Sequence, residues 1–117
     1  MRTLIANGTV SREELFISTK NGYIPNDADS GKSAAILVAE LIEEGLITKE
    51  DVAAEIHCMH PAFLENQLEA SLSNLGLETV DLMYMHNTFE SQSHFCEESE
   101  YMDKLKRAFE FLESKRQ

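Results

Sequence analysis

The chain has 117 residues, enough for one small domain. Hydrophobic residues make up 43% and charged residues 26%, a composition typical of a folded globular protein. Ten basic and 21 acidic residues give a formal net charge of −11, which argues against nucleic acid and anionic membrane surfaces as partners, because both require a cationic face. No apolar run is long enough to span a membrane and no signal-peptide pattern is found, so we expect a cytoplasmic protein.

The first half of the chain predicts a helix end, a strand, a loop and a second helix. Residues 1–7 have the pattern of a closing helix, because a glycine follows them. The β-rich run 15–20 predicts a short strand, and the turn-rich residues 21–31 predict a loop. Residues 33–44 predict a helix with Ser33 as its amino-terminal cap, and the nearly continuous apolar surface of this helix requires cover on most sides.

The second half predicts a helical turn, two longer helices and one more strand. Residues 51–55 predict the turn, and residues 61–75 predict a helix with proline at its first position and glycine after its last. The near-continuous apolar run 79–86 predicts a strand buried on both faces, as in a parallel sheet between helices. Residues 99–115 predict a helix whose apolar stripe comprises Tyr101, Met102, Leu105, Ala108, Phe109 and Leu112.

This alternation of strands and helices is typical of an α/β fold. Two strands cannot close a parallel sheet or cover these helices. A complete (β/α)8 TIM barrel needs about 250 residues. We therefore expect residues 1–117 to form a partial barrel domain, an incomplete slice that lacks its amino-terminal and carboxyl-terminal parts.

Each predicted strand ends in an ionisable residue, Lys20 in the first and His86 in the second. The carboxyl ends of parallel strands meet at one rim of such folds, where catalytic residues gather. A lysine there can lower the pKa of a neighbouring acid, and a histidine can donate a hydrogen bond to a carbonyl oxygen. Spacing alone leaves the alternative open that the lysine is simply solvated and the histidine is a bystander.

Two motifs carry a resemblance to a known family. Residues 12–20, REELFISTK, resemble the third-strand signature of the aldo-keto reductases, which ends in the catalytic lysine. Residues 68–77, LEASLSNLGL, and 80–87, VDLMYMHN, resemble the third helix and fourth strand of that family, and this strand ends in the catalytic histidine. The resemblance covers most of the chain from Arg12 onward and is weakest between residues 23 and 55.

The resemblance implies a barrel that uses NADPH to reduce an aldehyde or ketone. In this family a tyrosine is the general acid, a lysine paired with an aspartate lowers the tyrosine pKa, and a histidine orients the carbonyl. Lys20 matches the lysine, His86 matches the histidine, and Asn87 follows as in many members, near the substrate pocket. Asp27 and Tyr23 do not match the aspartate and tyrosine, which the resemblance places before Met1.

The resemblance places the loops that bind NADP(H) beyond Gln117. We therefore expect the chain alone to bind no cofactor and to be inactive. The alternative is a non-catalytic truncated product that acts as an interaction module and self-associates through exposed apolar helices.

Two other motifs give only weak indications of a phosphate-binding loop and of a zinc site. Residues 26–33, NDADSGKS, end like a phosphate-binding loop but lack its first glycine, and their aspartates would repel phosphate. A zinc site could be drawn from His57, Cys58, His60, His94 and Cys96, although their spacing matches no established pattern. We therefore assign no metal ligands, and with only two cysteines we expect no disulfide framework.

Overall fold

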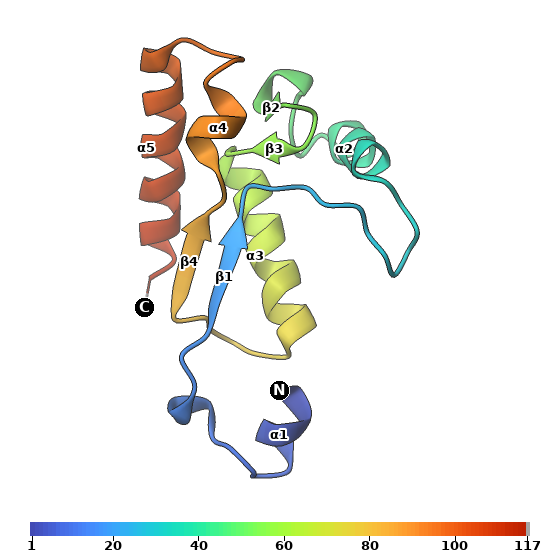
Figure 1. Cartoon of the computed structure of the whole chain (residues 1–117), viewed down its shortest axis with the longest axis vertical. Helices are drawn as coiled ribbons and strands as arrows, with labels where there is room; N and C mark the ends of the chain where they lie inside the picture. Colours follow the sequence, from blue (N-terminus) through green and yellow to red (C-terminus); the bar gives the residue numbers. More distant parts are fainter. Residues whose placement is uncertain (117) are drawn as a thin grey trace.

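Two four-residue strands, β1 (Ser18–Asn21) and β4 (Leu82–Met85), run parallel at the centre of the molecule (Figure 1). Lys20 pairs with Tyr84 in this register, and Asn21 pairs with Met85. The parallel pairing predicted for the two strands is thus confirmed. Both strands point toward the same end of the molecule, so their carboxyl ends meet at one rim.

The computed structural model describes residues 1–116, and its other elements surround this pair. They are α1 (Arg2–Ala6), the 3-10 turn η1 (Arg12–Glu14), α2 (Ala34–Glu43), the 3-10 turn η2 (Lys49–Asp51), β2 (Val52–Ala53), β3 (His57–Cys58), α3 (Pro61–Leu75), α4 (Thr88–Gln92) and α5 (Glu98–Ser114). Figure 1 shows α3 and α5 alongside the strands, whereas the β2–β3 hairpin, α2 and α4 lie beyond the strand tips. At the opposite end, α1 and η1 stand apart from the other elements (Figure 1).

Helix boundaries follow the capping signals of the sequence. The side chain of Ser33 accepts a hydrogen bond from the backbone of Ile36 and caps α2, as predicted. Pro61 is the first residue of α3, and Gly76 ends this helix in the left-handed conformation, with φ at 68°. Arg2 extends from α1 to donate hydrogen bonds to carbonyl oxygens in the last turn of α3, which ties the amino terminus to this helix.

The helical turn predicted over residues 51–55 is wrong. Thr48 and Asp51 do form a capping box, but the 3-10 turn η2 ends at Asp51 and β2 follows directly. The backbone then reverses, because Ala54 and Glu55 both adopt positive φ angles, 50° and 64°, which no helix tolerates. The result is an antiparallel hairpin with β3, which the sequence analysis did not predict.

The strand predicted over residues 79–86 is shorter and more exposed than expected. It pairs with β1 only from Leu82 to Met85, and its side chains alternate between exposed and half-buried. Tyr84 is 51% exposed and Leu82 is 37% exposed, so the prediction of burial on both faces is wrong for the described chain. The reason is that residues 1–116 provide helical cover on one face of this pair and none on the other.

The core lies between α2, α3, α5 and the hairpin. Its buried apolar residues are Ile24, Ala34, Ile47, Cys58, Met59, Phe63, Leu64, Tyr101 and Ala108. The predicted stripe of α5 divides: Tyr101 and Ala108 face this core, whereas Met102 and Phe109 are exposed. Half-buried Leu105 and Leu112 pack against the core from the same helix. Within residues 1–116, no helix is long and apolar enough to cross a membrane.

Candidate active site

Lys20 and His86 lie near each other at the rim where β1 and β4 end. His86 follows the last paired residue of β4, and its backbone N–H extends the ladder by donating to the carbonyl of Asn21 over 2.8 Å. Side chains two residues apart on a strand point to the same face. His86 therefore shares a face with Tyr84, and Tyr84 is the register partner of Lys20. From the spacings of strands and residues, the two Cα atoms are roughly 8 Å apart.

This shared face is the open face of the sheet. On the other face, Asn21 is buried against α3, where its Nδ2 donates to the carbonyl of Leu64 over 2.9 Å. Lys20 is exposed, and within residues 1–116 it forms no ion pair. The exposed ammonium of Lys20, one residue before the end of β1, and the half-buried imidazole of His86, one residue after the end of β4, are thus available to a molecule at this rim.

Both backbone polar groups of His86 are hydrogen-bonded. Its N–H is held by Asn21, as above, and its carbonyl oxygen lies 2.7 Å from Nε2 of His57 on β3. A carbonyl oxygen can only accept, so His57 Nε2 must carry a proton. The chain is therefore fixed where it leaves the β1–β4 ladder.

A second buried side chain fixes the tautomer of His57. Nε2 of Gln92, at the end of α4, lies 2.9 Å from Nδ1 of His57, and both side chains are fully buried. Nδ1 accepts from the amide, which leaves the proton on Nε2. Burial lowers the pKa of His57 below its ordinary value of 6.5, against the opposing effect of the hydrogen bond to His86, and the nearby imidazole of His86 lowers it further. His57 is thus held neutral.

The loop after β1 passes close to both histidines. Gly22 has a φ of 102°, and a Cβ atom there would lie 3.1 Å from His57 Nε2, so a side chain would strain both the backbone and the contact. Next to it, the ring of Tyr23 packs on the ring of His86, with centroids 5.1 Å apart and planes tilted by 44°. Tyr23 forms an isolated antiparallel bridge with His57, which brings the loop onto the hairpin.

Asn87 lies directly after His86, exposed and in the left-handed conformation, with φ at 39° and ψ at 51°. Asparagine is one of the few residues besides glycine that adopt this conformation readily. It is the N-cap residue of α4, but its side chain caps no backbone group of this helix. The left-handed turn from β4 into α4 thus explains why an asparagine occupies this position. The side-chain amide of Asn87 is exposed at the rim.

The other candidate motifs have structural explanations. In the loop of residues 26–33, the backbone N–H of Ala34 is bonded by Asn26 and that of Ile36 by Ser33, so the first turn of α2 already uses these donors. Lys32 pairs with Glu40 at 2.7 Å.

The cysteines and histidines from which a zinc site could be drawn are not arranged as ligands. His57 uses both ring nitrogens in the bonds described above, and burial raises the pKa of Cys58 to about 11, which disfavours the thiolate that binds metals. Residues 1–116 contain no group of three or more His, Cys, Asp or Glu residues that could hold a metal ion.

A charged contact holds the opposite end of the strand pair. Asp81 accepts from the backbone N–H of Ile17 and from the guanidinium of Arg12, each over 2.8 Å. The bond from Ile17, and then the bond from Arg12, lower the pKa of Asp81. Arg12 also donates to the carbonyls of Leu15 and Thr79. This contact explains the single acidic residue in the apolar run and fixes the start of both strands.

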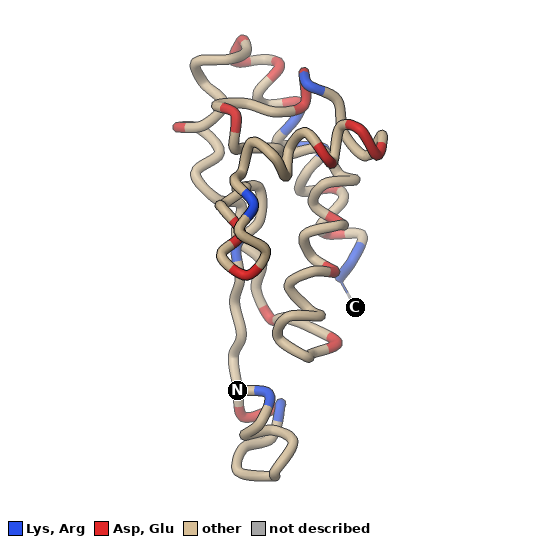
Figure 2. Tube along the Cα trace, turned by 90° about the vertical axis from the view of Figure 1, so that its right-hand side faces the viewer, with Lys and Arg blue, Asp and Glu red and all other residues tan. Residues whose placement is uncertain are grey.

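Charge elsewhere does not favour an anionic ligand. Figure 2 shows acidic positions spread from one end of the trace to the other, with the fewer basic positions scattered among them. Within residues 1–116, Lys20 is the one lysine or arginine in β1 and β4. The described chain therefore offers no cluster of basic residues for a phosphate at this rim.

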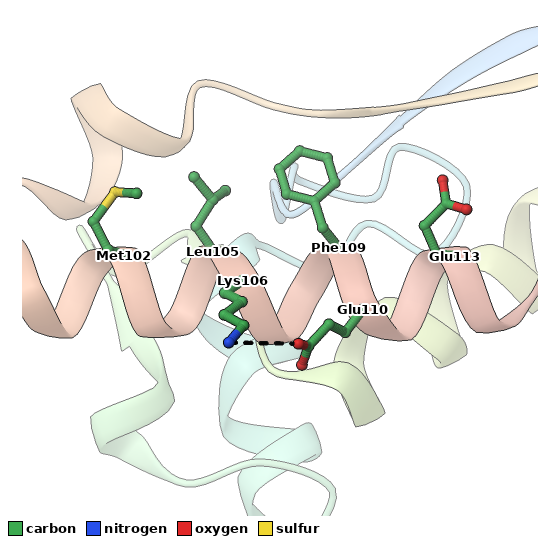
Figure 3. A pocket seen from close by; sticks show the side chains of 6 residues that line it. All are labelled: Met102, Leu105, Lys106, Phe109, Glu110 and Glu113. Atoms are coloured by element: carbon green, nitrogen blue, oxygen red, sulfur yellow. Dashed lines mark ion pairs between the residues drawn. The ribbon is translucent and has the colours of Figure 1, made fainter.

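A separate apolar hollow is lined by residues of α5. Met102, Leu105 and Phe109 project from one side of the helix, and the ion pair between Lys106 and Glu110 borders them (Figure 3). The hollow is about 440 Å³ and open to solvent. Its lining includes no Ser, Thr, Cys or His and no residue of the rim described above, so it is a surface feature distinct from the candidate active site.

The site can be compared with known proteins. A model of the aldo/keto reductase family matches residues 1–108. None of the curated proteins and none of the solved structures compared with the chain matches it. The family match spans both strands that end at the rim, together with Lys20, His86 and Asn87. The sequence analysis predicted these three residues but missed His57, Gln92 and Tyr23, because their roles depend on contacts between distant segments.

Proposed function

Because the chain belongs to the aldo/keto reductase family, whose members are oxidoreductases, we propose that Lys20 and His86 take part in the NADPH-dependent reduction of an aldehyde or ketone by the complete protein. The observation that carries this proposal is their position on one open face, at the carboxyl ends of adjacent parallel strands. Catalytic residues of parallel α/β barrels lie at such strand ends.

His86 has the geometry to orient a carbonyl substrate. Its backbone is fixed at both the N–H and the carbonyl, and its ring lies on Tyr23 at the rim. An imidazole N–H in this position would donate to the carbonyl oxygen, polarise the carbonyl bond and hold the carbon for attack. Asn87 would contribute its exposed amide to the edge of the same substrate pocket.

Lys20 would act on the proton donor. NADPH, when bound, supplies a hydride to the carbonyl carbon, and a proton must reach the carbonyl oxygen. We assign that proton to a tyrosine outside this chain, as the family resemblance implies. The Lys20 ammonium, unpaired within residues 1–116, would stabilise the tyrosinate that forms as the proton leaves.

The described residues fit the carbonyl end of this reaction and not the phosphate end of the cofactor. Lys20 is the one basic residue of the central strand pair, and the first amides of α2 are bonded by Asn26 and Ser33. The cofactor contacts would therefore come from other parts of a (β/α)8 barrel, of which residues 1–117 would be one slice. Titration of the chain alone with NADPH should accordingly give no saturable binding and no carbonyl reduction.

The test is a steady-state assay of the protein in which this chain is continued in frame by its neighbouring coding sequence. With NADPH and a panel of aldehydes and ketones, we expect saturable turnover. Replacing His86 by Gln should lower both the turnover number and the affinity for the carbonyl substrate, while His94→Gln, at an exposed histidine, should change neither. Tight stoichiometric binding of NADPH to the chain alone, or unchanged kinetics in His86→Gln, would contradict the proposal.

A second candidate function is self-association of the chain as an interaction module. The observation that favours it is the apolar hollow on α5, where Met102 and Phe109 are 53% and 50% exposed. A second copy of the chain would cover these side chains by packing α5 against α5. Sedimentation of the chain should then show a concentration-dependent dimer that Phe109→Asp abolishes and Phe95→Asp, at an exposed phenylalanine elsewhere, preserves. A monomer at all concentrations would exclude this function.

A further inference from the structure

Three elements converge on the point where His86 leaves the sheet. The carbonyl oxygen of His86 accepts from His57 on β3, and His57 in turn accepts from Gln92 at the end of α4. Both supporting side chains have no exposed surface, and the loop carrying Gly22 and Tyr23 lies against His57. His57 thus supplies a side-chain donor to the carbonyl of His86 at the point where the backbone ladder between β1 and β4 ends.

The direction of the two bonds is determined by their chemistry. The carbonyl of His86 requires a donor, so His57 must be protonated at Nε2, and the amide of Gln92 is the donor that leaves Nδ1 without a proton. The other amide atom, Oε1 of Gln92, is buried without a hydrogen-bond partner. A buried unpaired acceptor is costly, by about 1 to 3 kcal/mol, and such a cost in a folded protein calls for a specific reason.

We propose that His57, held by Gln92, is a positioning residue that fixes the His86 ring against Tyr23 at the open end of the sheet. The peptide carbonyl of His86 and its side chain are attached to the same Cα atom, so a bond that fixes the carbonyl also fixes the direction of the Cα–Cβ bond. The Tyr23 ring, whose centroid lies 5.1 Å from that of the His86 ring, then selects the rotamer of the His86 side chain. That the fixed His86 ring serves catalysis rests on the proposed function, whereas the fixed position of the ring rests on the contacts alone.

The unpaired Oε1 atom of Gln92 is consistent with the role of holding His57 in position. A glutamine that donates to His57 cannot turn its amide over without placing its oxygen against a nitrogen lone pair, so the bond to His57 determines the orientation of the amide. A methionine at this position would fill the same space without an unpaired atom. Gln92 is therefore a polar residue at a site where an apolar side chain would pack. What its amide contributes there is the hydrogen bond to His57.

The test uses the 117-residue chain and measures the contact between the rings of Tyr23 and His86 by NMR. In the wild type we expect cross-peaks between the ring protons of Tyr23 and His86, together with nitrogen shifts that show His57 neutral and protonated at Nε2. His57→Phe keeps a ring of similar size but removes the donor, so the Tyr23–His86 cross-peaks should be lost. His57→Gln, whose amide nitrogen can occupy the place of Nε2, should restore them, and the surface control His94→Gln should leave them unchanged.

Gln92→Met provides a second test if His57→Phe does not fold. It leaves the imidazole in place but removes the donor to Nδ1, so His57 should populate both tautomers and the Tyr23–His86 cross-peaks should weaken. Persistence of these cross-peaks at full strength in a folded His57→Phe or Gln92→Met chain would overturn the proposal.

Kinetics of the complete protein separate this inference from the proposed function. His57→Phe should lower turnover and carbonyl affinity as His86→Gln does, without a change in the dissociation constant of NADPH. If the complete protein reduces no carbonyl compound, the proposed function fails, while the ring contacts still decide whether His57 positions His86. If turnover is normal in a folded His57→Phe variant, the positioning role is excluded.

Discussion

The two ends of the β1–β4 pair are held in opposite ways. At the amino ends, Asp81 and Arg12 form a charged contact on the surface, with 35% and 22% of their side chains exposed. At the carboxyl ends, the buried side chains of Asn21, His57 and Gln92 form neutral hydrogen bonds. One end uses charge to join the strands, and the other joins them without any charge.

This contrast determines which ionisable groups of the strand pair remain without a partner. Because neutral groups hold the carboxyl ends, the ammonium of Lys20 and the ring of His86 take no part in fixing the strands. A charge already engaged in a buried pair could not be removed or redirected without a large cost. Within residues 1–116, the carboxyl rim thus combines hydrogen-bonded backbones with side chains whose polar atoms are unpaired, which is the arrangement that a catalytic site requires. The following predictions test this contrast, beginning with the largest expected effect.

Replacing Lys20 by Met in the complete protein should lower the turnover number by about 10²- to 10⁴-fold, the scale of general acid catalysis. The substitution keeps the length of the side chain but removes the charge that stabilises the tyrosinate, so the loss belongs to the chemical step. The dissociation constant of NADPH should change little. Steady-state kinetics check the prediction, with Lys49→Met as the control, because Lys49 is an exposed lysine of η2. A Lys20→Met enzyme within about twofold of wild type would identify Lys20 as a surface lysine.

Replacing Asn21 by Leu should lower the free energy of unfolding by about 1 to 3 kcal/mol, since the carbonyl of Leu64 and the N–H of Gly22 would lose their partner in a buried setting. Chemical denaturation of the chain measures this. Asn74→Leu, at an exposed position late in α3, is the matched control and should stay within about 0.5 kcal/mol of wild type. Equal effects of the two substitutions would show that the carboxyl end is not held as described.

Acidification should weaken the fold through His57. Its pKa in the folded state lies below 6.5, so below that pH the unfolded chain binds more protons at this site than the folded chain. This contribution to stability is complete above pH 6.5 and is lost as the pH falls through the folded-state pKa, by up to about 1.4 kcal/mol per pH unit. Denaturation between pH 7.5 and pH 5 should therefore show the free energy of unfolding of the wild type falling relative to that of His57→Gln as the pH falls. A constant difference between them would contradict the neutral state assigned to His57.

The local signals in the sequence predicted the helices well. A serine cap, a proline at the first position and a terminal glycine each determine a helix boundary through a few neighbouring residues, and Ser33, Pro61 and Gly76 act as predicted. The parallel pairing of β1 and β4 followed from an apolar run between helices and from the family motifs. The helix boundaries could be predicted because their causes lie within about one turn of the chain.

The supports of the candidate site could not be predicted, because they depend on the tertiary fold. His57 and His86 are 29 positions apart, and His57 and Gln92 are 35 apart. From the sequence alone, His57 can only be drawn into a zinc grouping of no established spacing with Cys58 and His60, since nothing local shows where its ring nitrogens point. The hairpin was missed for a related reason: Ala54 and Glu55 adopt positive φ angles that neither residue type favours, so the fold imposes the turn.

The smallest effect should come from the amino end. Replacing Asp81 by Asn keeps an oxygen for the N–H of Ile17 but removes the charge that attracts Arg12, so stability should fall by less than in Asn21→Leu. Because the pKa of Asp81 is lowered in the folded state, its contribution is present above the ordinary value of 3.8 and is lost as the pH falls through the folded-state pKa. The wild type and Asp81→Asn should therefore differ at neutral pH and low salt, and should converge both in acid and in concentrated salt, which screens exposed charges. Asn21→Leu, at the neutral end, should keep its full effect in salt. Denaturation of the three proteins at two salt concentrations measures this contrast, and salt sensitivity at both ends would show that charge contributes equally to each.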